Sequence, residues 1–169
     1  MNTQEVAQAG KVAAWLLLYD GHTPMFNFVL EGLTEEDARK RLDTPANHPI
    51  WLAGSLVQER FEMANALGLN EKQQAHALFD NHNGIQADAE YPSLDTLRAD
   101  WERITPILRE AFARAGADKL NGPNPWPMPG MDEINLLDML LYCIDRESYC
   151  IGQLGLWRRL LNYPPMPYQ

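Results

Sequence analysis

The segment of residues 135–161 constrains the fold most strongly, because apolar side chains occupy most sides of a helix built from it. Its apolar residues are Leu136, Leu137, Met139, Leu140, Leu141, Ile144, Ile151, Leu154, Leu156 and Trp157. A helix that is apolar nearly all round is a central, buried one. The sequence therefore predicts that the rest of the chain packs around this helix.

Three further long segments repeat apolar residues at steps of three and four, which is the helical period. They cover residues 3–33, 48–67 and 93–116. No segment alternates apolar and polar residues as a credible strand does. Four long helices predict an all-α fold, a four-helix bundle.

The breaker residues indicate where these helices begin and end. Gly21 and Pro24 fall inside the first segment and are expected to kink or break it, because proline removes a hydrogen-bond donor and clashes one turn back. Gly68 is a natural end for the second helix, and Ser93 is a natural start for the third. The polar residues 69–92 predict an irregular connection with a short helix near residues 71–79.

The length of 169 residues fits one ordinary domain, so we expect a single bundle over residues 1–169. Prolines alternate before the last helix, at Pro123, Pro125, Pro127 and Pro129. This stretch is an extended loop rather than a domain linker, because the last helix is too short to fold alone. Trp126 in this loop either closes a pocket or simply covers the open end of the bundle.

Acidic side chains outnumber basic ones by 23 to 14, which gives a formal net charge of −9. Proteins that bind duplex DNA carry a basic face for the phosphates, so we expect no nucleic-acid partner. The same balance disfavours docking on anionic membranes. The apolar run at residues 12–18 is much shorter than the roughly 18 residues of a transmembrane helix.

Cys143 and Cys150 are the only cysteines in the chain. If they lie on one helix, their Cα atoms are about 10.5 Å apart, whereas a disulfide needs roughly 4.4–6.8 Å. The two thiols therefore cannot pair with each other. The N-terminus lacks the basic region of a signal peptide, and we expect a cytoplasmic protein.

Several stretches carry a resemblance to a known family. They are residues 30–37 (LEGLTEED), 47–56 (NHPIWLAGSL), 140–154 (LLYCIDRESYCIGQL) and 158–164 (RRLLNYP). The Gly152-Gln153 pair and the Tyr163-Pro164 ending are the most specific part. In order and spacing, these elements resemble the DinB/YfiT-like superfamily over nearly the whole chain.

This resemblance implies an up-down-down-up four-helix bundle that often forms homodimers. Many members hold a divalent metal with three histidines. One histidine comes from the second helix and two come from the fourth, where a spacing of four puts both on one face. Characterised members include thiol-cofactor-dependent transferases and isomerases.

Each ligand position of that metal site holds another residue in this sequence. Ser55 follows Gly54 where the family has its first histidine, and Arg146 and Cys150 replace the histidine pair. A guanidinium stays protonated and cannot bind a metal, and one hydroxyl with one thiolate makes a poor divalent site. We therefore expect no metal and no cofactor. The four histidines form no metal pattern and are expected at the surface or at helix caps: His22, His48, His76 and His82.

The same positions define a candidate ligand pocket. Its residues are Trp51, Ser55, Glu59, Arg146, Cys150 and Gln153. Three interpretations stay open. The first is a former metal cavity closed by a structural ion pair of Arg146 with Glu59 or Glu62. The second is a pocket whose arginine binds a small anionic ligand, and the third is a retained site for another metal.

Two function hypotheses from different classes follow. The first is a binding or structural module that has lost the family metal, holds a small anionic or apolar ligand, and works as a homodimer. Exposed Trp15 and Trp101 are expected to support the dimer. The second is a transferase or hydrolase that depends on a metal or a thiol cofactor and uses unorthodox ligands such as Glu59, Cys150 or His48. In that case Arg146 would favour the Cys150 thiolate.

Overall fold

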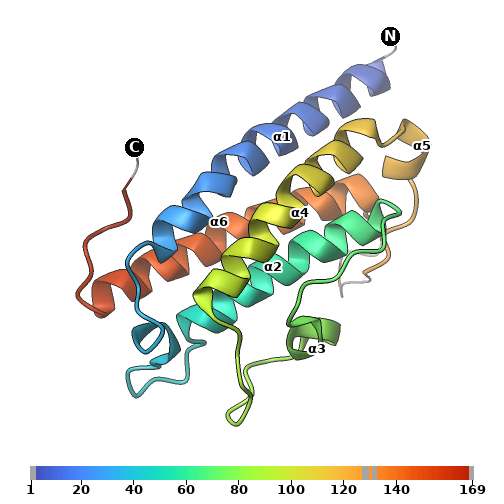
Figure 1. The fold of residues 1–169 in the computed structure, drawn as a ribbon. Coiled ribbons are helices and arrows are strands. Elements are labelled where there is room, and N and C mark those ends of the chain that lie inside the picture. Colours follow the sequence, from blue (N-terminus) through green and yellow to red (C-terminus); the bar gives the residue numbers. More distant parts are fainter. Residues whose placement is uncertain (1–2, 127–129, 131–132, 168–169) are drawn as a thin grey trace.

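The structure of the protein, a computed structural model, describes residues 3–126, 130 and 133–167, and its regular structure is helical (Figure 1). The α-helices are α1 (Thr3–Leu30), α2 (Pro49–Ala66), α3 (His76–Phe79), α4 (Leu94–Arg114), α5 (Ala117–Leu120) and α6 (Leu136–Leu160). Two 3-10 turns, η1 (Asp37–Arg39) and η2 (Asp80–His82), lie in the connections. The described residues form no strand beyond one isolated bridge between Pro123 and Asn135. Of the alternating prolines, Pro127 and Pro129 lie outside these residues.

Four long helices form the bundle predicted from the sequence. α2 packs against α4 and α6, and α1 packs against α6 and α4, so each long helix has two neighbours. The colours of Figure 1 show that α1 and α6 run one way and that α2 and α4 run the other. This arrangement is the up-down-down-up order. None of the helices in the described part of the chain is both long and apolar enough to cross a membrane.

Local caps set the helix boundaries close to the predicted ones. Nδ1 of His48 accepts the backbone N–H of Trp51 at 3.0 Å, so the histidine caps α2. Ser93 caps α4 in the same way, and Asn135 begins α6 with a reciprocal capping box. Gly68 follows the end of α2 with a φ of 107°, a conformation that favours glycine.

The predicted break in the first helix is wrong, since α1 continues through Gly21 and Pro24. Proline removes one backbone hydrogen bond, but α1 is anchored in the core on both sides of this position. Tyr19 and Phe26 are 0% exposed, whereas Pro24 lies on the exposed side of the helix. Tertiary packing therefore outweighs the local cost.

Aromatic side chains fill the centre of the bundle. Trp15 stacks on Phe112 at 3.9 Å between ring centroids, and Phe26 stacks on Trp101 at 4.0 Å. Both tryptophans are 0% exposed, and each donates its indole N–H to a backbone carbonyl. The expectation that Trp15 and Trp101 are exposed is therefore wrong.

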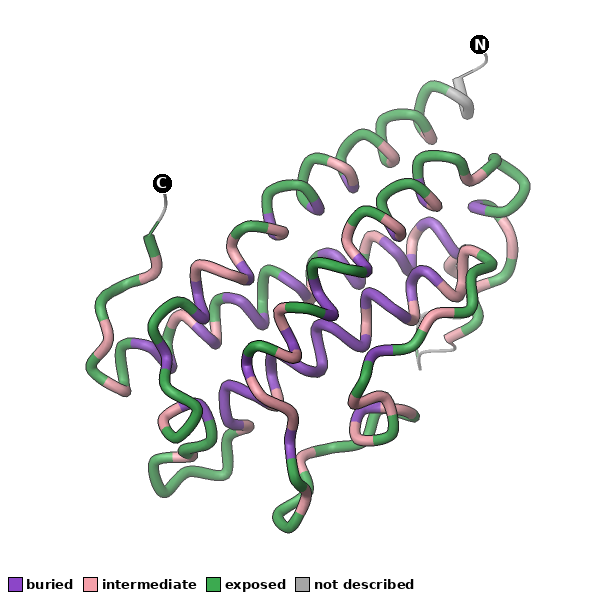
Figure 2. Tube along the Cα trace, viewed as in Figure 1, coloured by how far each residue is buried: buried purple, intermediate pink, exposed green. Residues whose placement is uncertain are grey.

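The most buried helix is α2 rather than α6. Figure 2 shows α2 buried along most of its length, while the N-terminal half of α1 is largely exposed. α6 keeps an uncovered side, on which Tyr149 and Leu156 are 69% and 60% exposed. Each long helix packs against only two other long helices, which leaves one side open; α3 and η1 cover part of that side on α2, whereas α5 covers less of α6. The prediction that the last helix is buried on nearly all sides is wrong for this reason.

An ion pair lies inside the bundle between α2 and α6. Nε and Nη2 of Arg60 donate to the two carboxylate oxygens of Glu147 at 2.6 and 2.9 Å. The guanidinium is sandwiched between the rings of Tyr19 and Trp101, 4.0 and 3.4 Å from their centroids. Nδ1 of His22 lies 3.3 Å from Glu147. This bidentate pair, with both side chains 0% exposed, fixes how α2 and α6 face each other.

Candidate functional site

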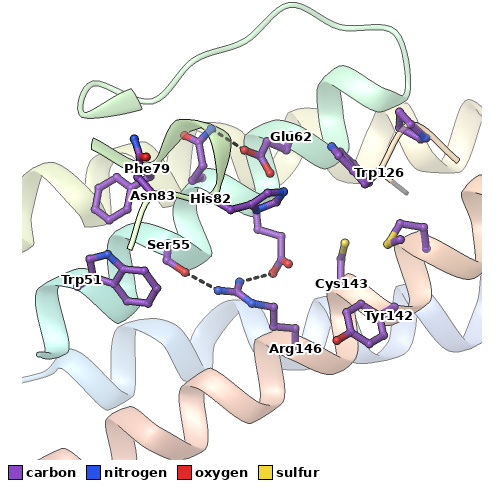
Figure 3. A pocket seen from close by; sticks show the side chains of 14 residues that line it. Trp51, Ser55, Glu62, Phe79, His82, Asn83, Trp126, Tyr142, Cys143 and Arg146 are labelled. Carbon is purple, nitrogen blue, oxygen red and sulfur yellow. Dashed lines mark hydrogen bonds and ion pairs between the residues drawn. The ribbon is translucent and has the colours of Figure 1, made fainter. Parts of the chain in front are cut away.

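A cavity of about 590 Å³ opens between α2, α6 and the two irregular connections (Figure 3). Its walls are mainly apolar and aromatic, and its polar groups come from α2, α6 and the segment after α3. The lining residues are Trp51, Ser55, Gln58, Glu59, Glu62, Phe79, His82, Asn83, Pro125, Trp126, Met139, Tyr142, Cys143 and Arg146. This volume lies within the range of small-molecule sites.

Arg146 lies at the polar centre of the cavity. Its Nη2 donates to Oγ of Ser55 at 2.6 Å, and its Nη1 donates to Oε2 of Glu59 at 3.0 Å. Ser55 and Glu59 are one turn apart on α2, so they share the face that meets α6. The predicted ion pair of Arg146 is therefore present, with Glu59 as its partner rather than Glu62.

Burial dominates the electrostatics of this centre. It raises the pKa of Glu59 to about 7, because the Arg146 guanidinium only partly offsets the cost of burying the carboxylate charge. Burial also raises the pKa of the Cys150 thiol, and the nearby guanidinium does not outweigh it. The thiolate that a nucleophilic Cys150 needs is thus disfavoured at neutral pH.

Four of the six candidate pocket residues line the cavity: Trp51, Ser55, Glu59 and Arg146. Cys150 is buried in α6 at 3% exposure, and Gln153 is half-buried one turn further on; neither lines the cavity. On the side of α6 that faces the cavity, the structure instead places Met139, Tyr142 and Cys143.

Several lining residues were missed from the sequence. Phe79, His82 and Asn83 belong to the irregular segment after α2, which carries no period to predict its position. Gly54, a glycine inside α2, was the one sequence signal for this contact. A methyl group at this position would overlap the Phe79 ring, so the missing side chain lets the segment pack on α2. Trp126 was not missed: the sequence left open whether it closes a pocket or covers the open end of the bundle, and it lines the cavity from the proline-containing loop.

Three of the four histidines contact groups that hold the fold together. His48 caps α2, and burial lowers the pKa of its ring to about 4. His22 lies beside the Arg60–Glu147 pair, and Nδ1 of His76 lies 3.1 Å from the Gln58 amide nitrogen. The predicted capping role holds for His48, and His82 is exposed and lines the cavity. For His22 the expectation of a surface or capping position is wrong, because the residue is buried beside the core ion pair.

The residues present do not fit the metal that the family resemblance implies. Ser55 and Arg146 bind each other where histidines would converge, and a guanidinium offers no lone pair to a cation. Within the described residues, no group of three or more histidine, cysteine, aspartate or glutamate side chains could hold a metal ion.

A protein-family model described as the DinB superfamily matches residues 18–149. The match spans α2 and α4, the C-terminal half of α1 from residue 18 onward, and the first half of α6. It therefore includes every residue that lines the cavity. No curated protein matches the chain significantly.

Proposed function

This chain belongs to the DinB superfamily, and we propose that it binds a small organic molecule in the cavity between α2 and α6. The observation that carries the proposal is the cavity itself, about 590 Å³ with aromatic walls and a central hydrogen-bonded arginine. Apolar walls with a few oriented polar groups are typical of small-molecule sites.

We favour binding over the enzymatic alternative because of where two of its proposed groups lie. His48 is engaged as a helix cap, and Cys150 is outside the cavity. Of the three unorthodox ligands that the enzymatic alternative names, Glu59 alone lines the cavity, and it is already bound to Arg146.

A fragment screen with a cavity-filling variant tests this proposal. Ligand-observed NMR with fragments of mixed charge is expected to give ligands that bind the wild type and are lost in Cys143→Phe, whose ring would occupy the cavity that Cys143 lines. Ser148→Phe adds the same ring at an exposed position of α6 and is expected to keep the ligands.

Circular dichroism establishes that each variant is folded. If Cys143→Phe does not fold, Trp126→Ala removes one wall of the cavity instead and is expected to weaken binding. The absence of any bound fragment, or equal binding by the cavity variants, would overturn the proposal.

The homodimer is a separate proposal. Leu17, Tyr149 and Leu156 are exposed apolar side chains on α1 and α6, and such surfaces are commonly covered by a partner. A concentration-independent mass equal to that of one 19.2 kDa chain in light scattering would contradict it.

A further inference from the structure

We propose that the ligand of the cavity is an organic cation, an amine or quaternary ammonium on an apolar body, whose charge lies at Glu62. This inference rests on the proposed function and names its ligand class. It replaces the small anion expected from an unpaired arginine, because the arginine of the cavity is already paired.

The first step is the charge balance of the cavity. Two carboxylates, Glu59 and Glu62, line it together with one guanidinium, and that guanidinium is bound to Glu59 and Ser55. Glu62 forms no ion pair with any described residue, and exposed His82 forms none either. When Glu59 is ionised, above its pKa of about 7, the cavity therefore holds one carboxylate without a cation, and a cationic ligand complements it.

The second step is the position of the Glu62 carboxylate. Oε1 of Glu62 accepts a hydrogen bond from Nε2 of Gln58 at 2.8 Å. The Gln58 amide is itself oriented, since its Oε1 accepts from Nε2 of Gln73 at 2.9 Å. Gln73 is 3% exposed and also donates to the backbone oxygen of Gly54. This chain of amides holds one carboxylate oxygen and leaves the other without a donor among the described residues.

The third step is the aromatic lining of the cavity that this carboxylate shares. Trp51, Phe79, Trp126 and Tyr142 line the same cavity, and Figure 3 shows them arranged on several sides of it. The face of an aromatic ring attracts a cation and repels an anion. A cavity that combines an unpaired carboxylate with aromatic walls is therefore suited to an ammonium group with an apolar body.

An anionic ligand meets two obstacles in the same cavity. It must compete with Glu59 for the Arg146 guanidinium, and it must approach Glu62, whose charge no described residue neutralises. The net charge of −9 adds a general repulsion of anions.

Matched probes that differ only in charge test the inference. Isothermal titration calorimetry of the full chain at pH 8, where Glu59 is ionised and the amines stay protonated, would compare 2-phenylethylamine, 2-phenylethanol and 3-phenylpropionate, and then the corresponding butylamine, butanol and pentanoate. We expect the amine of at least one series to bind about ten-fold more tightly than its alcohol, with the carboxylate weakest. Glu62→Gln is expected to remove this preference of the amine over the alcohol.

Glu102→Gln provides the matched control, because it removes one carboxylate charge from an exposed position of α4 outside the cavity. It is expected to keep the ten-fold preference. Equal binding of amine and alcohol would overturn the cation inference while leaving the proposed function intact. Tightest binding of a carboxylate, lost in Arg146→Met, would assign the cavity to anions. If no probe of either series binds, the inference is also overturned, and the fragment screen separately decides whether the cavity binds ligands.

Discussion

Two glutamate–arginine pairs join α2 and α6 at adjacent positions of both helices, and their surroundings differ. Arg60 and Glu147 lie inside the bundle and are 0% exposed, whereas Glu59 and Arg146 lie at the cavity, where the arginine side chain is 31% exposed. Successive residues of a helix point about 100° apart. Adjacent residues of the same two helices therefore form one pair in the aromatic core and one at the cavity.

The pKa values of the two glutamates are shifted in opposite directions. Burial raises the pKa of both carboxyl groups, but at Glu147 the charge and two hydrogen bonds of Arg60, with His22 beside them, outweigh burial and hold the pKa below its usual value. Glu59 receives one hydrogen bond from its arginine, and its pKa rises to about 7. A buried carboxylate therefore stays ionised only where the neighbouring positive charge and the hydrogen bonds it accepts together outweigh the cost of burial.

Breaking the core pair is expected to have the largest effect. Arg60→Met leaves the buried Glu147 carboxylate without its partner and should lower the free energy of unfolding by about 3–5 kcal/mol. Urea unfolding measures this loss. The double variant Arg60→Met with Glu147→Met should recover part of it, since it leaves no unpaired charge. Arg114→Met, at an exposed ion pair with Glu110, should leave stability unchanged, and a similarly small loss in Arg60→Met would contradict the role of the core pair.

The pH dependence of unfolding sharpens the comparison. The pKa of Glu59 is about 7 in the folded protein, whereas an ordinary glutamate has a pKa of 4.5. Between these two pH values, the carboxyl group of Glu59 is therefore protonated in the folded state and ionised in the unfolded state. Stability from this group is present at low pH and is lost as the pH rises from about 4.5 to 7, a difference of about 1–3 kcal/mol. Unfolding curves between pH 4.5 and 8 should show this loss in the wild type but not in Glu59→Gln.

The contribution of Glu147 to stability should change with pH in the direction opposite to that of Glu59. Its folded pKa is lowered, so its contribution to stability is present above the ordinary glutamate pKa and is lost as the pH falls through the folded value. Glu147→Gln should therefore flatten the acid side of the stability curve. A common pH response in the two glutamine variants would contradict the assignment of opposite shifts.

Breaking the cavity pair is expected to cost less than breaking the core pair. Arg146→Met removes the partner of Glu59, but that carboxyl group can take up a proton near neutral pH and become neutral. We expect a loss of about 1 kcal/mol at pH 6 in urea unfolding. A loss as large as that of Arg60→Met would show that the two pairs are equivalent.

Metal removal is expected to have the smallest effect. Protein purified without a histidine tag should carry well under one equivalent of zinc, nickel, iron or manganese by elemental analysis, and a chelator should leave its melting temperature unchanged. The reason is that Arg146 places a fixed positive charge at the position of the family's ligands. Near-stoichiometric metal that is lost together with stability would contradict this.

A gain-of-function variant checks the same placement. Ser55→His, Arg146→His and Cys150→His together restore the three histidines of the family pattern and should create metal binding. A folded triple variant that binds no metal would contradict the correspondence of these positions.

The sequence predicted much of the fold and part of the site. Helical periodicity and caps located the four long helices, and the spacing of Ser55 and Glu59 predicted that they share a face. The resemblance to the family predicted that this face meets Arg146, and the hydrogen bonds of Arg146 agree. The Arg60–Glu147 pair was not predicted, because it depends on how each helix is rotated about its own axis in the bundle.

By itself, the sequence determined the helices, the family and the replacement of three histidines, since these follow from residue identity and spacing. The tertiary structure alone decided that Trp15 and Trp101 are internal, that α2 rather than α6 is the most covered helix, and that Pro24 does not break α1. It also decided that Phe79 and His82 line the cavity while Cys150 does not. Each of these depends on contacts between residues distant in the chain, and the energy of such contacts outweighs the local preferences that a sequence pattern records.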